Sequence, residues 1–247
     1  MKKTIYLAVI TLITIACVLI GVNEWYGGNG IHFSFGKDER KYSIEESATL
    51  EAFHSIAVDA AVMDLTIVEG TDYSLDYKGT EKLEITYRIE KEELVVIQRK
   101  NGNLIGINNA TLILTVPKDA QLEKMNIKVD VGDIDVEGVD VKLLGAESDV
   151  GDVTIENAAL ENVILSSDTG DIDVDNCSFV MLDMSSDVGD MEVDSSIDIS
   201  GYAFDLKTDV GKVEVGDGEY GKKYYQAGKN GSITARGDVG DISINDL

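Results

Sequence analysis

Residues 148–156 read SDVGDVTIE, and the Asp-Val-Gly-Asp tetrad within this stretch is the unit that decides the fold. Further copies, some of them looser, stand at residues 130–133, 168–171, 187–190, 209–212 and 238–241. The first four tetrads follow one another at a constant step of 19 residues, and the last two come after longer steps. A fixed period of this length is the signature of a repeat architecture in which each unit stacks on its neighbours.

Within one repeat, apolar side chains alternate with polar ones, as expected for short β-strands. Ile127 and Val129 occupy alternate positions of the sequence. This alternation moves by one residue at Gly132, continues through Ile134 and Val136, and then moves by one residue again. Each repeat is therefore expected to hold two or three short strands joined by corners. Glycine suits a corner that needs positive φ, and the flanking aspartates can bond to nearby backbone groups. The pattern predicts an all-β, β-helix-like β-solenoid with coils of about 19 residues.

Equivalent apolar residues of successive coils should stack into inward columns. One predicted column contains Ile134, Val153, Ile172, Met191, Val213 and Ile242, and the other contains Val136, Ile155, Val174, Val193, Val215 and Ile244. Cys177 falls in the apolar column of Val139 and Ala158, and we interpret it as core filling.

Residues 45–124 differ from the repeats but are related to them. The stretch at 62–67 matches residues 131–136 with Met63 in place of the corner glycine, which predicts a degenerate first coil. Alternating strands are predicted at Tyr73–Tyr77, Leu83–Ile89, Leu94–Gln98 and Leu112–Val116. These strands could cap one end of the solenoid and protect its edges. The expected domain therefore spans 45–247, with a cap at 45–124 and repeat coils at 125–247.

The amino-terminal segment predicts a membrane anchor. Residues 4–22 are mostly apolar and uncharged, and Lys2 and Lys3 precede them. A helix needs about 20 such residues to cross a bilayer, and basic residues favour the cytoplasmic side. We expect an anchor at 1–25, a stalk at 26–44 and a single-pass cell-membrane protein whose carboxy-terminal domain is extracytoplasmic. A cleaved signal peptide over residues 1–25 is the alternative.

Composition excludes several classes of function. The chain has 247 residues with 46 acidic and 21 basic side chains, giving a net charge of −25. This charge repels phosphate backbones, so no nucleic-acid partner is expected. The two cysteines and two histidines lie far apart in sequence and offer no zinc-ligand spacing. No nucleophile elbow or phosphate-binding loop is present, and a non-enzymatic protein is expected.

Four features together resemble a bacterial family known as the "putative adhesin" family, a domain of unknown function with β-strand repeats. They are the single amino-terminal membrane segment, the Phe53-His54-Ser55-Ile56 opening, the strand of residues 112–117, and the repeated coils. In layout the chain is similar to one subgroup of this family. That subgroup includes the membrane-anchored protein designated G of the Lia cell-envelope-stress operons. The resemblance implies an extracytoplasmic β-solenoid with an adhesin or scaffold role at the cell envelope, and it supplies no catalytic residues. The envelope protein or glycan that it would bind is not specified.

The repeated aspartates suggest a cation hypothesis. Stacked coils lie about 4.8 Å apart, so like charges would align along the solenoid. The two predicted ladders are Asp130, Asp149, Asp168 and Asp187, and Asp133, Asp152, Asp171 and Asp190. Calcium could bridge such oxygens, which would make the protein a calcium-stabilised adhesion module. We favour structural turns, because the period differs from that of the calcium-binding β-roll and each turn has one glycine. No other cofactor is expected.

Aromatic residues gather around the two insertions near the carboxy terminus. The residues are Tyr202, Phe204, Tyr220, Tyr224 and Tyr225, and basic residues accompany them. They could form a partner patch, although a cap filled by aromatic side chains is the favoured interpretation. A carbohydrate-active β-helix enzyme is a further alternative, since glycosidases use paired carboxylates. Against it, a catalytic pair should break the repeat at one place, whereas these acids recur in coil after coil.

Overall fold

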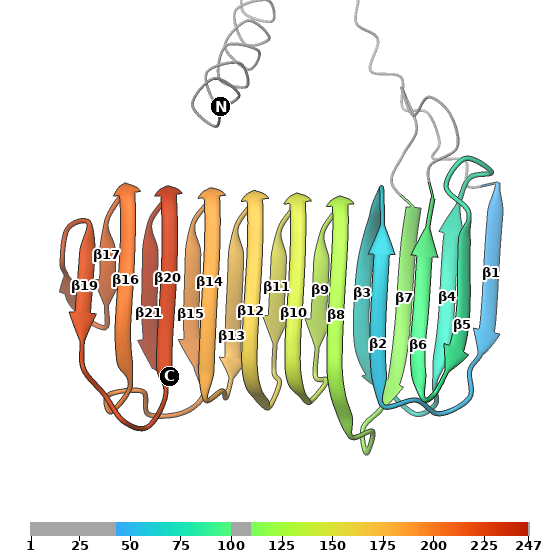
Figure 1. Ribbon diagram of the computed structural model, residues 1–247, viewed down its shortest axis with the longest axis horizontal. Coiled ribbons are helices and arrows are strands. Elements are labelled where there is room, and N and C mark those ends of the chain that lie inside the picture. Colours follow the sequence, from blue (N-terminus) through green and yellow to red (C-terminus); the bar gives the residue numbers. More distant parts are fainter. Residues whose placement is uncertain (1–42, 100–109, 247) are drawn as a thin grey trace, which may run out of the picture. The chain divides into compact units, whose positions relative to one another are not determined.

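The computed structural model describes residues 43–99 and 110–246, and within them every regular element is a β-strand. The predicted anchor at 1–25 and almost all of the predicted stalk lie outside the described residues. The strands form two facing sheets, with sheet B in front of sheet A in Figure 1. No helix within the described residues is long and apolar enough to cross a membrane.

Both sheets run along the stack of coils. Sheet A has the spatial order β1 (Ile44–Thr49), β4 (Ser74–Gly79), β7 (Ala110–Pro117), β3 (Met63–Gly70), β9 (Ile134–Glu137), β11 (Val153–Glu156), β13 (Ile172–Cys177), β15 (Met191–Ser195), β21 (Ile242–Asp246), β17 (Val213–Val215) and β18 (Gly218–Glu219). Sheet B has the order β19 (Lys223–Gln226), β16 (Ala203–Val210), β20 (Ser232–Val239), β14 (Met181–Val188), β12 (Leu160–Thr169), β10 (Val141–Val150), β8 (Leu122–Val131), β2 (Ser55–Ala60), β6 (Glu93–Gln98) and β5 (Ile85–Glu90). The repeat coils pair in parallel, and antiparallel strands lie at both ends.

Each repeat supplies two strands rather than three. The coil that contains residues 141–156 places the long strand β10 in sheet B and the short strand β11 in sheet A. Val139 and Val141, which follow the second shift in alternation, line the corner and the beginning of β10, where both are buried, and form no third strand. The core fills the space between the sheets, and alternation within each strand decides which side chains enter it.

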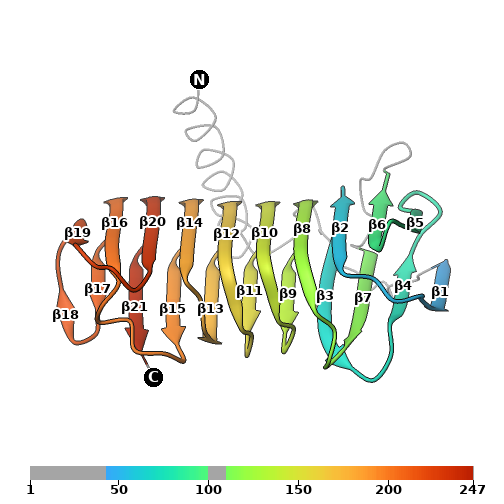
Figure 2. The ribbon, with the colours of Figure 1, turned by 60° about the horizontal axis from the view of Figure 1, so that its bottom comes forward.

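The predicted inward columns form, but their order differs from the chain order at the carboxy-terminal end. Val153 pairs with Ile134 and Ile172 on its two sides, and all three are fully buried. Ile242 then lies between Met191 and Val213, because the last coil inserts between the two preceding ones (Figure 2). The carboxy-terminal strands β20 and β21 are therefore internal members of the sheets and not a terminal tail.

The amino-terminal strands confirm the degenerate coil. Strand β3 pairs in parallel with β9 in the register that aligns Leu65 with Ile134, as the match of 62–67 to 131–136 predicts. Antiparallel strands β4 and β1 continue sheet A beyond β7, and β5 continues sheet B beyond β6. The turn between β5 and β6 contains Lys91 and Glu92, both with positive φ.

Corner glycines allow the coils to approach one another. Gly170 has φ +152°, and a Cβ atom there would lie 2.1 Å from the carbonyl oxygen of Gly151. Gly132, Gly151, Gly189, Gly211 and Gly240 share this arrangement, with φ between +137° and +156°. Backbone cannot move aside as a flexible side chain can, so the corner position requires glycine for space as well as for conformation.

Replacing a corner glycine should therefore destabilise the domain strongly. We expect Gly170→Ala to lower the free energy of unfolding by about 3 kcal/mol or more, because strain and a backbone clash add. Gly216→Ala is the matched control: φ is +53° there, but no atom lies within 4 Å of the added carbon. It should cost only about 1 kcal/mol. Equal losses in urea unfolding of the two variants would contradict the role of the close approach.

Candidate functional site: surfaces of the solenoid

The second aspartate of each tetrad bonds to the backbone of the next coil. The Oδ1 atom of Asp133 accepts a hydrogen bond from the backbone N–H of Asp152 at 3.0 Å. The same bond joins Asp152 to Asp171 at 2.8 Å and Asp171 to Asp190 at 2.7 Å. Asp241 continues the ladder, since its N–H donates to Asp190 at 2.7 Å. Hydrogen bonds from N–H groups to carboxylates offset the repulsion within the ladder.

The other side of the corner is bonded as well. The hydroxyl groups of Ser148 and Ser167 donate to the carbonyl oxygens of Gly132 and Gly151, both at 3.0 Å. The first aspartates of the tetrads form a row at the corner end of the sheet B strands, where Asp149, Asp168 and Asp187 each follow a serine. This row contains Asp130, Asp149, Asp168 and Asp187. Across the described ranges, no group of three His, Cys, Asp or Glu side chains is arranged to hold a metal ion. The geometry thus gives the predicted Asp133 ladder a structural role, and calcium binding stays a prediction.

Sheet A carries a strongly acidic outer face over the repeat coils. Its outward carboxylates are Asp135, Glu137, Glu156, Asp173, Asp175, Glu192, Asp194 and Glu214. Strands β9, β11, β13, β15, β17 and β21 contain no lysine or arginine. The alternation of each short strand implies this face, because every residue between two inward apolar residues must point outward. We define these eight carboxylates as the acidic face.

Two members of the acidic face titrate abnormally. Burial, followed by repulsion from Asp133, raises the pKa of Asp135 above its ordinary value. Burial and then repulsion from Glu192 raise the pKa of Asp173. Burial and neighbouring carboxylates thus oppose the ionisation of these two residues, whereas Glu214 of the acidic face is ion-paired with Lys212 at 2.8 Å. Burial also raises the pKa of Cys177 to about 11, and its side chain is fully buried, which fits the predicted core role.

The predicted aromatic patch is divided between the core and the end of the solenoid. Tyr202 and Phe204 are buried, and the Tyr202 hydroxyl donates to the carbonyl oxygen of Phe179 at 2.6 Å. Tyr224 packs against Tyr220 with ring centroids 4.3 Å apart, and Tyr225 is 76% exposed. Strand β19, which carries two of these tyrosines, pairs antiparallel with β16. Tyr220 and Tyr224 therefore lie at the carboxy-terminal end, whereas Tyr202 and Phe204 fill the core.

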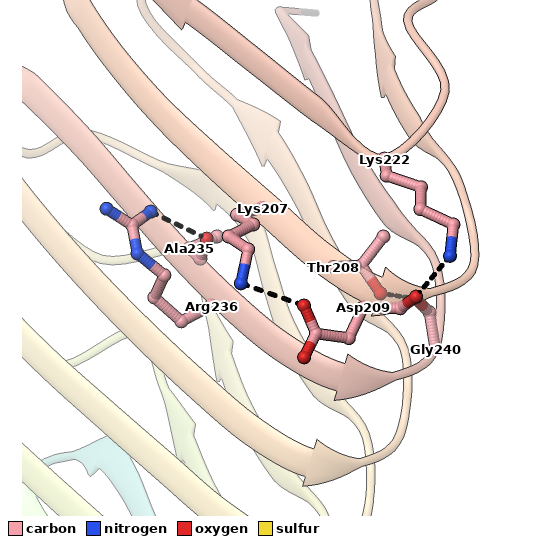
Figure 3. A network of polar contacts seen from close by, with 7 residues as sticks. All are labelled: Lys207, Thr208, Asp209, Lys222, Ala235, Arg236 and Gly240. Carbon is pink, nitrogen blue, oxygen red and sulfur yellow. Dashed lines mark hydrogen bonds and ion pairs between the residues drawn. The ribbon is translucent and has the colours of Figure 1, made fainter.

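Several basic residues near this end form contacts within and between strands (Figure 3). The ammonium group of Lys207 lies 2.8 Å from a carboxylate oxygen of Asp209, and Lys222 Nζ donates to the Asp209 carbonyl at 2.5 Å. Arg236 forms an ion pair with Asp205 and donates to the carbonyl of Ala235 at 3.1 Å. These cations are engaged in contacts within β16 and between β16 and either β20 or the turn that joins β18 to β19.

Sheet B presents a different outer face, which sequence analysis missed. Val131, Val150 and Val210 are exposed at the corner ends of its strands, and four further large apolar side chains are exposed away from the corner: Leu143 (47%), Ile164 (62%), Val180 (52%) and Met181 (48%). They belong to three adjacent strands, β10, β12 and β14, or directly precede one of them. We define these four residues as the apolar patch. Its sequence signal is an apolar residue at an outward position of each long strand.

The family assignment agrees with this architecture. The chain matches the Toastrack DUF4097 family over residues 53–245. This chain belongs to the Toastrack DUF4097 family. The match confirms the resemblance drawn from the opening motif, the strand at 112–117 and the repeated coils. The similarity to the Lia subgroup stays a prediction.

Solved structures of bacterial proteins are similar to this Toastrack chain. A "putative cell adhesion protein" from Clostridium sporogenes is 16% identical, covers 83% of this chain and 99% of its own, and has a TM-score of 0.49. A "putative adhesin" from Bacteroides fragilis is 18% identical, covers 81% of this chain and 96% of its own, and has a TM-score of 0.45. No curated protein matches the chain.

The bonded Asp133 ladder predicts stability that is independent of calcium. We expect the melting temperature of the purified chain to be the same in EDTA and in millimolar calcium, because the backbone already occupies Oδ1 of these aspartates. Magnesium at the same concentration is the control for nonspecific screening of the acidic face. A rise of several degrees that only calcium produces would instead identify the ladders as ion sites.

The raised pKa of Asp173 predicts a stability effect that depends on pH. Its charged form costs folding free energy, so the cost is absent near pH 3 and appears as the pH rises through the raised pKa. Asp173→Asn should therefore raise the free energy of unfolding at pH 7 and change it little near pH 3. Asp198→Asn is the control of opposite sign, because hydrogen bonds from Ser200 lower the pKa of Asp198. Urea unfolding at both pH values measures this, and a destabilised Asp173→Asn at pH 7 would refute it.

Proposed function

We propose that this protein is a non-enzymatic, membrane-anchored extracytoplasmic adhesin or scaffold that acts at the bacterial cell envelope, with envelope stress as its physiological setting. The acidic face carries the proposal: eight carboxylates repeat at equivalent positions along one sheet, on strands without a lysine or arginine. A periodic surface of one charge favours a partner that is itself extended and cationic, because many weak contacts then form together. The apolar run at residues 4–22 supports the anchor.

Repetition also weighs against the enzyme alternative. A glycosidase needs one acid and one base whose environments differ, set about 5 to 9.5 Å apart. Here Asp135 and Asp173 share the same strand position two coils apart, and the same causes shift their pKa values in the same direction. This equivalence favours binding over catalysis. The calcium-stabilised adhesion module remains the second form of the proposal, decided by the melting experiment above.

Anchoring is tested by removing residues 1–25. We expect the truncated chain to leave the membrane fraction and appear in the medium or the extracytoplasmic soluble fraction, while the full chain stays with membranes. A fusion that attaches an unrelated membrane helix to the truncated chain should restore fractionation. A truncated chain that still sediments with membranes would argue against the anchor.

Recognition through the acidic face is tested with neutral variants. Asp135→Asn, Asp173→Asn and Glu192→Gln combined should weaken binding of the chain to isolated envelope material by roughly tenfold, since three charges leave the face. The matched control neutralises Asp59, Glu123 and Asp183 outside this face. Equal binding by the two triple variants would contradict a role for the acidic face.

A further inference from the structure

The two sheets end unevenly at the amino-terminal end of the stack. Counted from the coil of β8 and β9, sheet B continues through β2, β6 and β5, whereas sheet A continues through β3, β7, β4 and β1. Sheet A therefore has 11 strands and sheet B has 10. In Figure 1, β1 is the outermost strand at this end. The pair of sheets is one strand short beside β5, opposite β1.

The outer edge of β5 is open within the described ranges. A two-residue turn joins β5 to β6, so Glu90 and every second residue before it exchange backbone hydrogen bonds with β6. The N–H and C=O groups of Ile85, Tyr87 and Ile89 therefore point away from β6. No strand pairs with them in the part of the chain that the structure describes. β5 also contains no proline or bulge, two devices by which native edges prevent pairing.

The inner face of β5 is apolar and incompletely covered. Ile85, Tyr87 and Ile89 pack against the core but are only partly buried, whereas Leu94 and Val96 of β6 are fully buried. The difference arises because β6 has neighbours on both sides and β5 has one. A further strand beside β5 would cover these three side chains, and apolar inward side chains of that strand would gain most from the contact.

Glu46 on β1 faces the same position from the opposite sheet. It pairs with the buried Tyr77 on β4, so its side chain lies on the inner face of sheet A. A carboxylate oxygen of Glu46 accepts a hydrogen bond from the Tyr87 hydroxyl at 3.0 Å. Covering a carboxylate costs free energy unless a cation pairs with it. A strand that fits beside β5 therefore carries a lysine or arginine among its inward side chains.

Glu46 also discriminates between occupants of this edge. The amino-terminal edge strands of a second copy supply no inward base, since β1 would add another Glu46 and β5 would add apolar side chains. On the outer face, Arg88 is ion-paired with Glu90 at 3.0 Å, and Glu84 precedes the strand. The charges on both faces of the edge, and the net charge of −25, thus favour a basic segment from another protein.

We propose that the open edge of β5 binds an extended segment of a partner protein in which apolar inward side chains flank a lysine or arginine. The segment adds a strand to sheet B through backbone hydrogen bonds, and its base pairs with Glu46. Addition of a strand to a free sheet edge is a recurring mode of peptide recognition, in which the side chains give specificity. The site is separate from the acidic face and from the anchor, so it holds or fails independently of the proposed function.

Peptide binding to the full chain in neutral detergent tests the proposal. One fluorescent probe carries the capped sequence Thr-Val-Thr-Lys-Thr-Val-Thr, and a second has glutamate in place of lysine. The parent should bind the lysine peptide roughly tenfold more tightly than the glutamate peptide. Glu46→Lys should reverse this preference, and its binding of the glutamate peptide then shows that the variant is folded. No saturable binding of the lysine peptide by the parent up to about 1 mM would overturn the proposal.

Glu45→Lys is the matched control for the charge of the chain. Glu45 neighbours Glu46 but pairs with Lys78 on the outer face of sheet A. This variant should keep the preference of the parent for the lysine peptide. A change of preference as large as that of Glu46→Lys would show unspecific attraction to an acidic chain, which overturns the proposal.

Hydrogen exchange of backbone amides locates the bound peptide. A saturating concentration of the lysine peptide should slow exchange at Ile85, Tyr87 and Ile89 by roughly tenfold or more, because their N–H groups then bond to the added strand. Amides of β19, at the other edge of sheet B, should be unchanged. Binding without this slowing would overturn the site. Slow exchange before the peptide is added would show that the full chain already covers this edge, which also overturns the proposal.

Discussion

The close contact between backbones at the corner is the constraint on which the rest of this structure depends. A corner glycine of one coil faces the carbonyl group of the glycine below it at a distance that no β-carbon can occupy. This contact fixes how the coils stack at the corner, and the registers of both sheets are in step with it. Because a slip of one residue would turn every inward side chain outward, a corner that pins the register also protects the core.

The aspartates and serines around that corner form hydrogen bonds that join successive coils of the stack. Carboxylate oxygens accept N–H groups of the next coil, and serine hydroxyls donate to glycine carbonyls of the coil before. The polar groups of the corner thus find partners within the chain, although the sharp bend takes them out of ordinary strand pairing. The carboxylate of an aspartate in this position accepts hydrogen bonds and faces water. Part of the high acidic content of the chain therefore comes from aspartates that the turn requires for its hydrogen bonds.

Much of the fold could be predicted from the sequence because the repeat carries its own register. The step of 19 residues, the alternation and the corner glycines fix the coils, the inward columns and even the degenerate coil at Met63. The insertion of β20 and β21 between earlier coils could not be predicted. Ile242 satisfies the same column pattern wherever its coil is placed, so the pattern contains no information about the order of neighbours. For the same reason, the sequence pattern does not predict that β19 pairs with β16, because this pairing depends on the conformation of the preceding hairpin.

The surfaces were harder to predict than the core, for a related physical reason. Burial tolerates few residue types, so inward positions repeat faithfully, whereas outward positions tolerate many and must be interpreted together with their neighbours across strands. The acidic face emerges only when the short strands are assigned to one sheet, and the apolar patch only when Leu143, Ile164 and Met181 are seen on adjacent strands. Both faces use the same alternation that builds the core. The short strands of sheet A that place the apolar columns inward therefore also place the carboxylates of the acidic face outward, so the core and this face follow from one alternation.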